Sequence, residues 1–592
     1  MLPDHTASSP TSALYAWHGR AAWRILATDF GHGAHFLQTW QAWLTEAPPS
    51  AQLHYIAIAD PAPSAADVLA HAPAALQPQA QCLSQALYGL LPGVHRLSFA
   101  QGRVLLTLWI GSVADMLRQQ HSTLDALLLN SPLASDAHTI KALARHCQRG
   151  TVVHAPLADE RLRHAMESAG FVWSAPPDAG PASLCAEFTP RWQPRVRHST
   201  PTPIEQPGNA LVIGAGLAGA SMAYSLALRG WQVTVLAQGT APADGASGLP
   251  AGLFCPHVSP DDSVLSRLSR SGVRMMLQRL RDVCQEGLDW GHSGVLEHCT
   301  DGGTGLPRDW AHTAGAAWSH PTTAAQLQTA GLPADTAACW HAQAGWVRPA
   351  QFVQAQLQHP RIQFQGQARV ARLVRNSAHG PWQALDAANH CLAQATLVVL
   401  ASGPATAALL PPPVQWPLQA LRGQVTWGLH SADNAGALPP FPVNGNGNLV
   451  THVPTAQGAA WVMGSTFERD VSELPIQAAD QNAAHATNYA KLATLLPGSA
   501  PALAPWFTPS HPHCQPTWGQ VRCASHDRLP IAGPVHSDAP ELWALTALGA
   551  RGLTLSVLCA ELIAAQLHGE PLPLDSKLAQ HLGTERLARL RP

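Results

Sequence analysis

The stretch that decides the fold reads Ala210-Leu-Val-Ile-Gly214-Ala-Gly216-Leu-Ala-Gly219 and lies near the middle of a chain of 592 residues. Its apolar beginning predicts a buried β-strand. Gly214 then allows a tight turn, Gly216 lets the backbone approach a pyrophosphate, and Gly219 lets the next helix pack closely on the strand. This order of residues predicts a dinucleotide-binding turn.

The residues that follow complete the unit with one departure. An apolar helix is expected over residues 220–229 and a second strand over 233–236. A carboxylate that holds the ribose hydroxyls is expected where the second strand ends. Ala237 and Gln238 stand there instead, and Asp244 is a later substitute. The pattern therefore predicts a βαβ unit of an α/β domain without the usual ribose acid.

Composition bounds the class of protein. A chain of this length is expected to hold two or three domains. The formal net charge of −2 gives no overall attraction to nucleic acid, so a polyanionic partner needs a local positive patch. The eleven cysteines form no C-x-x-C pair, and their odd number argues against a disulfide framework. No secretory signal or membrane-spanning run is found, so a reduced, cytoplasmic protein without a membrane partner is expected.

The 31 histidines raise the question of a metal site. Their densest cluster, His511-Pro-His513-Cys514, lies in a proline-rich stretch without a second pair of ligands. Because a closed metal site usually needs four ligands, no metal is expected here.

Upstream of the glycine motif the chain alternates strands and helices, which is typical of a doubly wound fold. Strands are expected over residues 22–26, 53–58, 103–109 and 124–129. Gly31 and Gly33 follow the first strand, and Asp60 follows the second. A glycine turn and an acid in these positions are suited to hold a nucleoside, the adenosine of S-adenosylmethionine included.

A proline-rich stretch without periodicity separates the two halves and predicts a linker. The expected domains are 1–178, a linker at 179–207, and 208–592, the last with a substrate subdomain at about 255–395 and 415–515.

The second half carries further small-residue turns of the kind that approach a cofactor. Gly245-Ala-Ser247-Gly248 follows the second strand of the unit, and a buried strand near residues 395–400 ends at Gly403. Near the end, Leu548-Gly549-Ala-Arg551-Gly552 opens a helix that is expected to reach Gln566. The N-terminus of that helix presents free N–H groups and positive potential to an electron-rich ring or a phosphate.

These motifs, with Ala344-Gly-Trp346-Val-Arg-Pro349 and Arg522-Cys-Ala-Ser-His-Asp527-Arg-Leu-Pro530, resemble the D-amino-acid-oxidase-type flavoproteins. More narrowly, nearly the whole chain resembles a family of bifunctional bacterial tRNA-modifying enzymes of 5-methylaminomethyl-2-thiouridine biosynthesis. The resemblance implies a Rossmann-like methyltransferase fold fused to an FAD-binding, doubly wound α/β domain with an inserted α+β substrate domain.

The resemblance also implies a two-step reaction on the wobble uridine of tRNA. The FAD half oxidises a carboxymethylaminomethyl side chain at its C–N bond, hydrolysis releases glyoxylate, and an aminomethyl group remains. The other half then methylates that amine from S-adenosylmethionine. A cation should hold the substrate carboxylate, and arginine does so with two contacts. Arg551 and Arg522 are the candidates. The alternative is that either arginine only pairs with a structural carboxylate such as Asp527.

The first half departs from the family at its methyl-transfer site. Asp29 replaces a glycine of the cofactor loop, Ala59 replaces the acid after the second strand, with Asp60 one place late, and Ser112 replaces an aspartate. The family's catalytic aspartate falls on the stretch Asn130-Ser-Pro132-Leu-Ala134. An amide cannot accept a proton as a carboxylate does. Either methyl transfer persists, or the retained fold serves as a tRNA-docking or stabilising module.

A tRNA substrate requires a positive surface. One candidate is the linker with Arg191, Arg195, Arg197 and His198, and another is a helical stretch with Arg267, Arg270, Arg274, Arg279 and Arg281. Several of these helical arginines are three or four residues apart and are expected to share an exposed face.

Two other functions fit parts of the sequence. The chain could be an FAD oxidase of free glycine, D-amino acids or other small amines, against which stand the fused first half and the arginine clusters. It could also be a nucleotide-binding scaffold that has lost chemistry in both halves.

Overall fold

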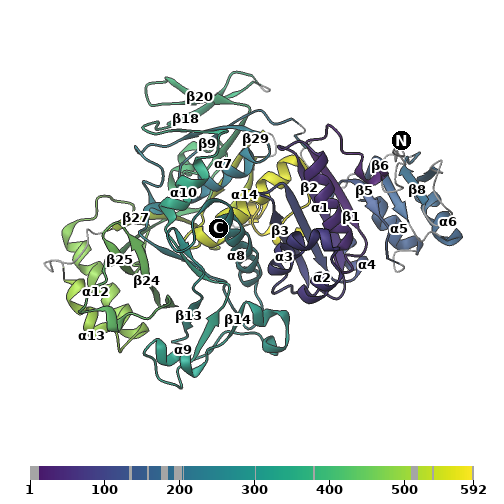
Figure 1. Cartoon of the computed structure of the whole chain (residues 1–592). Coiled ribbons are helices and arrows are strands. Elements are labelled where there is room, and N and C mark those ends of the chain that lie inside the picture. The colour runs from purple at the N-terminus through teal and green to yellow at the C-terminus, as the bar shows by residue number, and fades with distance from the viewer. Residues whose placement is uncertain are drawn as a thin grey trace, which may run out of the picture. The chain divides into compact units, whose positions relative to one another are not determined.

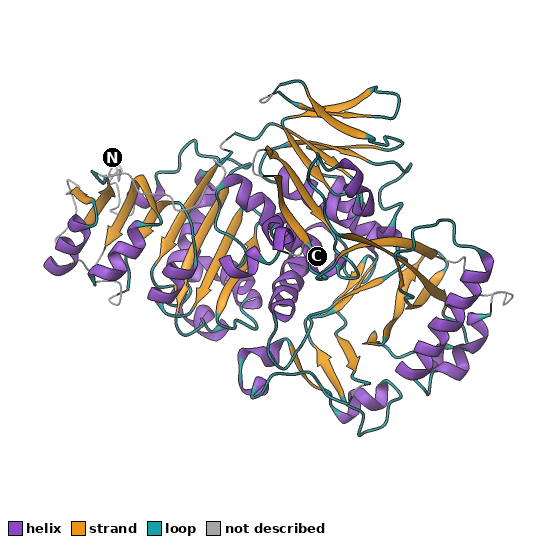
Figure 2. Cartoon of the chain, turned by 180° about the vertical axis from the view of Figure 1, so that it is seen from behind, coloured by secondary structure: helices purple, strands orange, loops and turns teal. Residues whose placement is uncertain are grey.

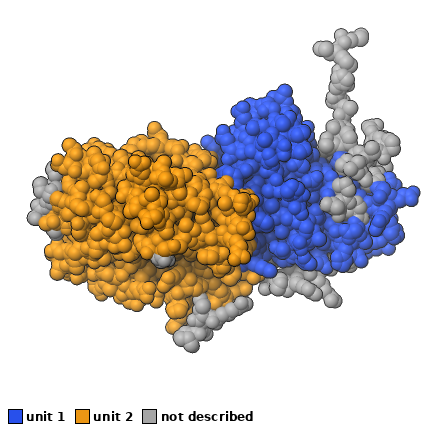
Figure 3. Space-filling view, turned by 90° about the horizontal axis from the view of Figure 1, so that it is seen from below, with its two compact units in different colours: residues 1–205, 565–579 blue, residues 206–564, 580–592 orange. Residues whose placement is uncertain are grey.

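The computed structural model describes residues 12–131, 136–155, 159–174, 184–191, 203–204, 206–300, 302–377, 380–508, 518–536 and 539–589. The chain forms two compact units, coloured separately in Figure 3. Unit 1 comprises Met1–Glu205 with Ala565–Ala579, and unit 2 comprises Gln206–Ala564 with Gln580–Pro592. In the described residues, no helix has both the length and the apolar character needed to cross a membrane.

Unit 1 is built on an eight-stranded sheet in the order β3-β4-β2-β1-β5-β6-β8-β7. Its strands are β1 (Ala22–Ala27), β2 (Gln52–Ala59), β3 (Gly93–Phe99), β4 (Val104–Ile110), β5 (Leu124–Leu128), β6 (Cys147–Ala155), β7 (Phe171–Ser174) and β8 (Leu184–Phe188). The central strands β4, β2, β1, β5 and β6 pair in parallel. This parallel centre gives unit 1 its Rossmann-like topology.

Helices cover the sheet of unit 1 because its central strands are apolar on both sides (Figure 2). Ile25 and Ala27 of β1 join one buried cluster, whereas Leu26 between them joins another. This alternation places one core on each face of the sheet. The helices are α1 (Ala34–Glu46), α2 (Ala65–His71), α3 (Gln77–Ala86), α4 (Val113–Gln119), α5 (Ala137–Ala144) and α6 (Glu160–Ser168).

Two features of unit 1 correct the expected boundaries. The predicted linker at 179–207 contains β8, which pairs antiparallel with β6 and β7 and is therefore part of the sheet. The strand is short, with Pro181 and Pro190 near its two ends, and its sequence has no alternating pattern that would reveal it. The segment 565–579, expected in the flavin domain, belongs to unit 1: Arg24 donates to the carbonyl oxygen of His568 (3.0 Å), and buried Arg96 donates to that of Pro571.

Unit 2 contains the expected dinucleotide-binding sheet, in the order β17-β10-β9-β21-β29-β28. Figure 1 labels two of its strands, β9 and β29. Its strands are β9 (Asn209–Ile213), β10 (Gln232–Leu236), β17 (Ile362–Gln365), β21 (Leu397–Leu400), β28 (Ile531–His536) and β29 (Ala539–Thr546). The five strands from β17 to β29 pair in parallel. The main helices of this layer are α7 (Leu217–Ala227), α8 (Val264–Val283), α10 (Pro349–Leu357) and α14 (Gly552–His568).

A second, mainly antiparallel sheet forms the inserted part of unit 2. It contains β13 (Val295–His298), β14 (Ser319–Pro321), β15 (Ala338–His341), β22 (Leu418–Leu429), β23 (Val443–Gly445), β24 (Gly447–Thr455), β25 (Gly458–Gly464), β26 (Glu468–Arg469) and β27 (Trp518–Ser525). The helix α12 (Ala478–Leu495) packs on it. The expected substrate subdomain at 255–395 therefore also includes elements of the dinucleotide-binding layer, namely α8, α10 and β17.

Two three-stranded sheets complete unit 2. One contains β11 (Gly252–Phe254), β12 (Trp290–Gly291) and β16 (Gly345–Val347), and the other contains β18 (Arg372–Arg375), β19 (Trp382–Leu385) and β20 (Cys391–Ala395).

The prediction of an exposed arginine face on α8 is wrong for three of its five arginines. Arg270, Arg274 and Arg279 are buried, and only Arg267 and Arg281 are exposed. The buried guanidiniums have partners inside the unit. Arg270 pairs with Asp262 at 2.6 Å, Arg274 lies 5.2 Å from the centre of the Trp318 ring, and Arg279 pairs with Glu561 at 3.0 Å. Spacing along the helix could not show these partners, because they lie outside α8: Asp262 just before it, and Trp318 and Glu561 in later segments.

Candidate flavin and carboxylate site

The turn after β9 requires glycine at two of its positions. Gly214 has a φ of 114°, in the left-handed region, and a Cβ there would lie 2.4 Å from the carbonyl oxygen of Ala401. A Cβ on Gly219 would lie 1.7 Å from the carbonyl oxygen of Gly214, so the first turn of α7 touches the strand backbone. These contacts leave the N-terminus of α7 directly after the strand, where it favours an anionic ligand.

Ser247 closes one side of this turn. Its hydroxyl oxygen accepts a hydrogen bond from the backbone N–H of Leu217 at 2.9 Å, and a Cβ on Gly216 would lie 2.8 Å from the same oxygen. Gly248 packs against the carbonyl oxygen of Ala243, whereas a Cβ on Gly245 would meet open space. The small-residue segment predicted after β10 therefore lies against the glycine turn.

Asp244, the later substitute for the ribose acid, serves its own turn. Its carboxylate accepts a hydrogen bond from the backbone N–H of Ala241 at 3.3 Å. A Cβ on Gly239 would clash with the same carboxylate.

Three more predicted glycines belong to segments around the turn. The carbonyl oxygen of Gly403 accepts a hydrogen bond from the Thr546 hydroxyl at 3.3 Å. The N–H of Gly549 donates to the carbonyl oxygen of Cys523 at 2.8 Å, which fixes the loop before α14 beside β27. A Cβ on Gly552 would lie 3.1 Å from Leu217. The structure thus brings the predicted glycines to the carboxyl ends of the parallel strands, the edge at which open α/β sheets bind ligands.

Arg522 lies on β27 with its guanidinium largely withdrawn from water. It donates to the hydroxyl of Ser465 (3.1 Å) and to the carbonyl oxygen of Thr466 (2.9 Å), and it stacks 4.2 Å from the centre of the Phe467 ring. Burial lowers the pKa of Arg522 to about 10. Within the described part of the chain it forms no ion pair with a carboxylate.

Arg551 stands immediately before α14, and its carbonyl oxygen accepts from Leu555 N–H of the first turn. Burial and the nearby charge of Arg528 lower the pKa of Arg551. The alternative partner, Asp527, is occupied elsewhere: its carboxylate accepts from Arg586 at 2.8 Å. In the ranges that the structure describes, neither candidate arginine pairs with Asp527. Their backbone segments are neighbours, whereas Arg522 extends toward Ser465.

The corresponding turn of unit 1 is built differently. The Asn130 side chain accepts from the N–H of Asp29 at 2.9 Å and donates to the carbonyl oxygen of the same residue at 2.7 Å. The Asp29 carboxylate accepts from the N–H of Gly31 at 2.9 Å. Residues 132–134 of the predicted catalytic stretch lie outside the described residues. Asn130 therefore connects the end of β5 to the loop after β1, and both the oxygen and the nitrogen of its amide form hydrogen bonds.

The other predicted residues of unit 1 lie at the ends of its strands and in the loops after them. Gly31 and Gly33 have φ angles of 54° and 80°, and only Gly33 is crowded, by the Phe30 ring. Asp60 is exposed after β2. Ser112 caps α4 by accepting from the N–H of Asp115.

Comparison with known proteins decides the family. A family model described as FAD dependent oxidoreductase matches residues 209–566. A protein of Delftia acidovorans named tRNA 5-methylaminomethyl-2-thiouridine biosynthesis bifunctional protein MnmC is 51% identical, over 97% of this chain and 93% of the relative. The chain belongs to the MnmC family. A second MnmC protein, from Paracidovorax citrulli, is 49% identical over 97% of this chain and 93% of its own length.

The unit that carries the FAD dependent oxidoreductase match also has the fold of solved structures. The L-proline dehydrogenase of P. horikoshii aligns with a TM-score of 0.50 at 14% identity, over 65% of this chain and 99% of its own. At this identity the likeness shows the fold alone. MnmC membership and this fold confirm the predicted α/β architecture of an FAD-dependent oxidoreductase.

Sequence reasoning missed part of the surroundings of Arg522 in this MnmC protein. Lys491 of α12 donates to the carbonyl oxygen of Ser465 at 2.7 Å and lies 5.4 Å from the centre of the Phe467 ring. Burial and Arg522 lower the pKa of Lys491. The Phe467 ring therefore has two cations against it while 53% of the residue remains exposed. The chain has only three lysines, and the rarity of that residue was the available signal.

Two predicted features lie outside the described residues. These are the cluster at residues 511–514 and, in the basic linker, Arg195, Arg197 and His198. Arg191 of that linker is described and exposed.

Proposed function

We propose that this chain carries out the FAD-dependent removal of the carboxymethyl group from 5-carboxymethylaminomethyl-(2-thio)uridine at the wobble position of tRNA, which leaves 5-aminomethyl-(2-thio)uridine. The names of its relatives assign those proteins to tRNA 5-methylaminomethyl-2-thiouridine biosynthesis. Arg522 and Arg551 support this substrate, because both are withdrawn from water, lie on segments beside the glycine turn, and form no ion pair among the described residues. A substrate that brings its own carboxylate would supply the missing anion.

The residues present fit an FAD group. Gly214 and Gly219 leave bare backbone that a Cβ would fill, and the N-terminus of α7 opens beside them. Gly216, Gly245, Ser247, Gly248, Gly403, Gly549 and Gly552 are the further residues that would hold FAD. When bound, FAD supplies the oxidation, since it accepts a hydride from the carbon beside the substrate amine.

The arginines of the chain would bind and orient the side chain of the modified uridine. A guanidinium contacts a carboxylate through two parallel N–H groups, which fixes the direction of the carboxymethyl arm as well as its position. Because Arg522 and Arg551 are withdrawn from water, their attraction to a carboxylate is stronger than at a surface. Oxidation of the C–N bond gives an imine, and water hydrolyses it to glyoxylate and the aminomethyl group.

Phe467 offers a place for the nucleobase next to this carboxylate site. Exposed aromatic rings stack single-stranded bases, and nearby cations contact the phosphates. Phe467 is exposed, and Arg522 and Lys491 lie against its ring. We propose this ring and Lys491 as the tRNA contact of unit 2, in place of the arginines of α8 that the structure buries.

The test uses the purified full chain and tRNA that carries the carboxymethylaminomethyl group, with nucleosides read by mass. Loss of the carboxymethyl mass together with release of glyoxylate is expected. Oxidation of free glycine or sarcosine at a comparable kcat/KM, with the tRNA untouched, would instead show a small-amine oxidase. Absence of bound flavin would leave neither oxidase and would point to the scaffold.

Methyl transfer is the second candidate, for unit 1. Its Rossmann-like sheet and the word bifunctional in the relatives' names favour this activity. Asn130 argues against this activity. Its amide is hydrogen-bonded to the backbone of Asp29, and an amide cannot accept the proton of the substrate amine as a carboxylate would. We therefore propose that the aminomethyl product accumulates even when S-adenosylmethionine is supplied. Appearance of the methylaminomethyl nucleoside in the same assay would contradict this.

A further inference from the structure

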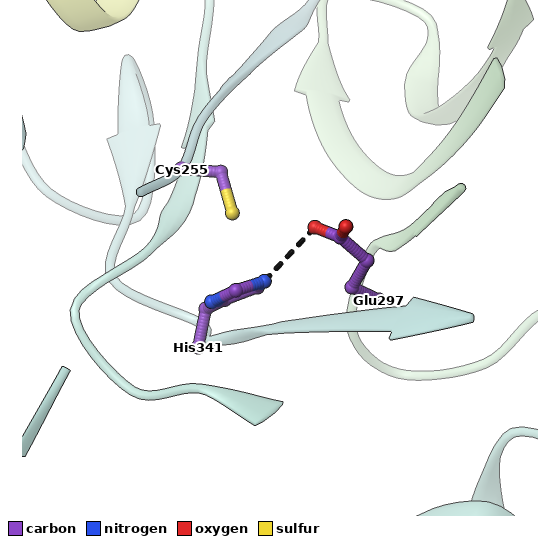
Figure 4. Close-up of side chains that lie close together, drawn as sticks. All are labelled: Cys255, Glu297 and His341. Atoms are coloured by element: carbon purple, nitrogen blue, oxygen red, sulfur yellow. Dashed lines mark hydrogen bonds and ion pairs between the residues drawn. The ribbon is translucent and has the colours of Figure 1, made fainter. Parts of the chain in front are cut away.

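Three side chains of types that can ligate a metal meet inside unit 2 (Figure 4). They are Cys255, which follows β11, Glu297 of β13, and His341, which ends β15. One ligand atom of each, a sulfur, a carboxylate oxygen and a ring nitrogen, lies within 4.8 Å of the other two. His341 is fully buried, and the Glu297 side chain keeps 26% of its surface exposed, which leaves a way in from solvent.

Strand pairing explains why two of the three converge. β13 and β15 are antiparallel, with Glu297 opposite Cys339 and Val295 opposite His341. Because side chains alternate across a sheet, Glu297, Cys339 and His341 share one face. Cys255 reaches that face from a different sheet, in which β11 pairs with β16.

Each of two ligands also has an outer partner that orients it. The Nδ1 atom of His341 lies 2.7 Å from the hydroxyl oxygen of Ser319, and its Nε2 atom points to a Glu297 carboxylate oxygen at 3.0 Å. The side-chain amide of Asn444 donates to the same carboxylate oxygen at 3.1 Å. The hydrogen bond between Ser319 and Nδ1 of His341 orients the ring so that Nε2 can face an ion, as the outer-shell partners of metal ligands do.

We propose that Cys255, Glu297 and His341 form a binding site for a zinc-class divalent cation. Zinc takes a thiolate, an imidazole and a carboxylate together, and its ligand atoms lie about 3.3–3.8 Å apart in a tetrahedron. A further thiol, that of Cys339, lies next to the site, with its sulfur 3.5 Å from Nε2 of His341. The ion requires Nε2 without its proton, a tautomer that Ser319 accommodates because its hydroxyl also accepts.

The ion would join the segment after β11 to the inserted sheet. His257 lies two residues beyond Cys255, and its ring is close enough to the Arg551 guanidinium for their charges to interact. A bound zinc ion would therefore fix the position of a segment that faces the proposed carboxylate site. Zinc binding itself does not depend on the reaction proposed for unit 2. The sequence expectation of no metal rested on ligands close together along the chain, and these ligands come from distant segments.

The test uses the full flavin-loaded chain, stripped with a chelator and dialysed against zinc. We expect one zinc per chain by elemental analysis. Cobalt in its place should give tetrahedral bands in the red, beyond the flavin absorption. Binding of zinc should also protect Cys255, but not the exposed Cys391, from alkylation read by mass. Zinc far below one per chain, or alkylation of Cys255 unchanged by zinc, would overturn the site.

Variants separate the ligands from the fold. Cys255→Ser and His341→Gln should each weaken zinc binding by about 100-fold or more, and the outer-shell variant Ser319→Ala by about 10–100-fold. The matched control Cys391→Ser lies on β20 and should bind as the unaltered chain does. Bound flavin and the thermal midpoint confirm that each variant is folded. If Cys255→Ser folds and binds zinc as tightly as the control, the assignment is wrong.

Discussion

The turn after β9 and the turn after β1 occupy the same place in two parallel sheets, and the chain fills them in opposite ways. After β9, Gly214 and Gly219 leave backbone so close that no Cβ fits. After β1, Asp29 stands in the loop and the Asn130 amide clasps it. The turn after β9, the open turn, therefore leaves its backbone uncovered by side chains, whereas the loop after β1, the closed turn, is hydrogen-bonded to a side chain of its own unit. Two domains with a similar fold thus differ in what their corresponding turns can bind.

The largest expected effect comes from adding one methyl group to the open turn. In Gly219→Ala the new Cβ would lie 1.7 Å from a carbonyl oxygen, so α7 must move from the strand. We expect about a 100-fold or greater loss of FAD affinity, measured as flavin retained after purification. The matched variant Gly31→Ala meets no atom within 4 Å and should cost unit 1 about 1–2 kcal/mol through its left-handed φ, with flavin unchanged. Equal flavin in both variants would remove the contrast.

The second effect concerns the buried ion pairs that join α14 to the end of α7 and to α8. Glu561 of α14 pairs with Arg229, which follows α7, at 2.9 Å and with Arg279 at 3.0 Å, and all three are buried. Glu561→Gln removes the buried carboxylate that the two buried guanidiniums share, so we expect a loss of about 3–5 kcal/mol in the free energy of unfolding of unit 2. Glu46→Gln, at the exposed end of α1, should change stability by less than about 0.5 kcal/mol.

The same pair predicts a pH dependence. Burial raises the pKa of Glu561, but the two arginines outweigh it and the pKa falls to about 2. A lowered carboxyl pKa stabilises the fold fully above its unfolded value near 4.5, and that contribution fades as the pH falls toward 2. The difference in urea unfolding between the unaltered chain and Glu561→Gln should therefore shrink over this range. A difference that stays constant down to pH 2 would contradict the pairing.

The third effect is on the reaction of unit 2. Arg551→Lys keeps the charge but loses the two-pronged contact, so kcat/KM for carboxymethylaminomethyl-tRNA should fall about 10–100-fold. Arg528→Gln removes the exposed neighbouring charge and should change kcat/KM less than about threefold. Nucleoside mass spectrometry measures both. Activity in Arg551→Lys equal to that of the control would assign the carboxylate to another residue.

The smallest expected effect tests the closed turn. Asn130→Asp replaces the amide that donates to the carbonyl oxygen of Asp29, at a cost of about 1 kcal/mol. The new carboxylate is a proton acceptor, and we expect a gain of methylaminomethyl nucleoside when S-adenosylmethionine is present. Flavin content serves as the control, since it belongs to unit 2. No gain in a folded variant would show that the loop around Asp29 also blocks the reaction.

Local patterns predicted the open turn well because its requirements are local. Strand β9, the glycines and α7 follow one another within nineteen positions, from Asn209 to Ala227, and β10 follows soon after. The prediction failed where partners are distant. The arginines of α8 were expected at the surface, yet Arg279 is buried because Glu561 comes from α14. Strand β8 was hidden in a proline-rich stretch because its pairing with β6 is made only in the sheet.

The sequence was sufficient to predict the family, the α/β class of both units, and the glycines that are needed where backbone segments come too close for a Cβ. It also determined that an amide replaces a carboxylate at Asn130, since that is a matter of residue identity. Only the tertiary structure decided which charges pair: Asp527 with Arg586, Glu561 with Arg279, and Arg522 with no acid among the described residues. Only the tertiary structure brought Cys255, Glu297 and His341 together. Backbone requirements are written in neighbouring residues, whereas burial and charge pairing depend on segments that only the folded chain brings into contact.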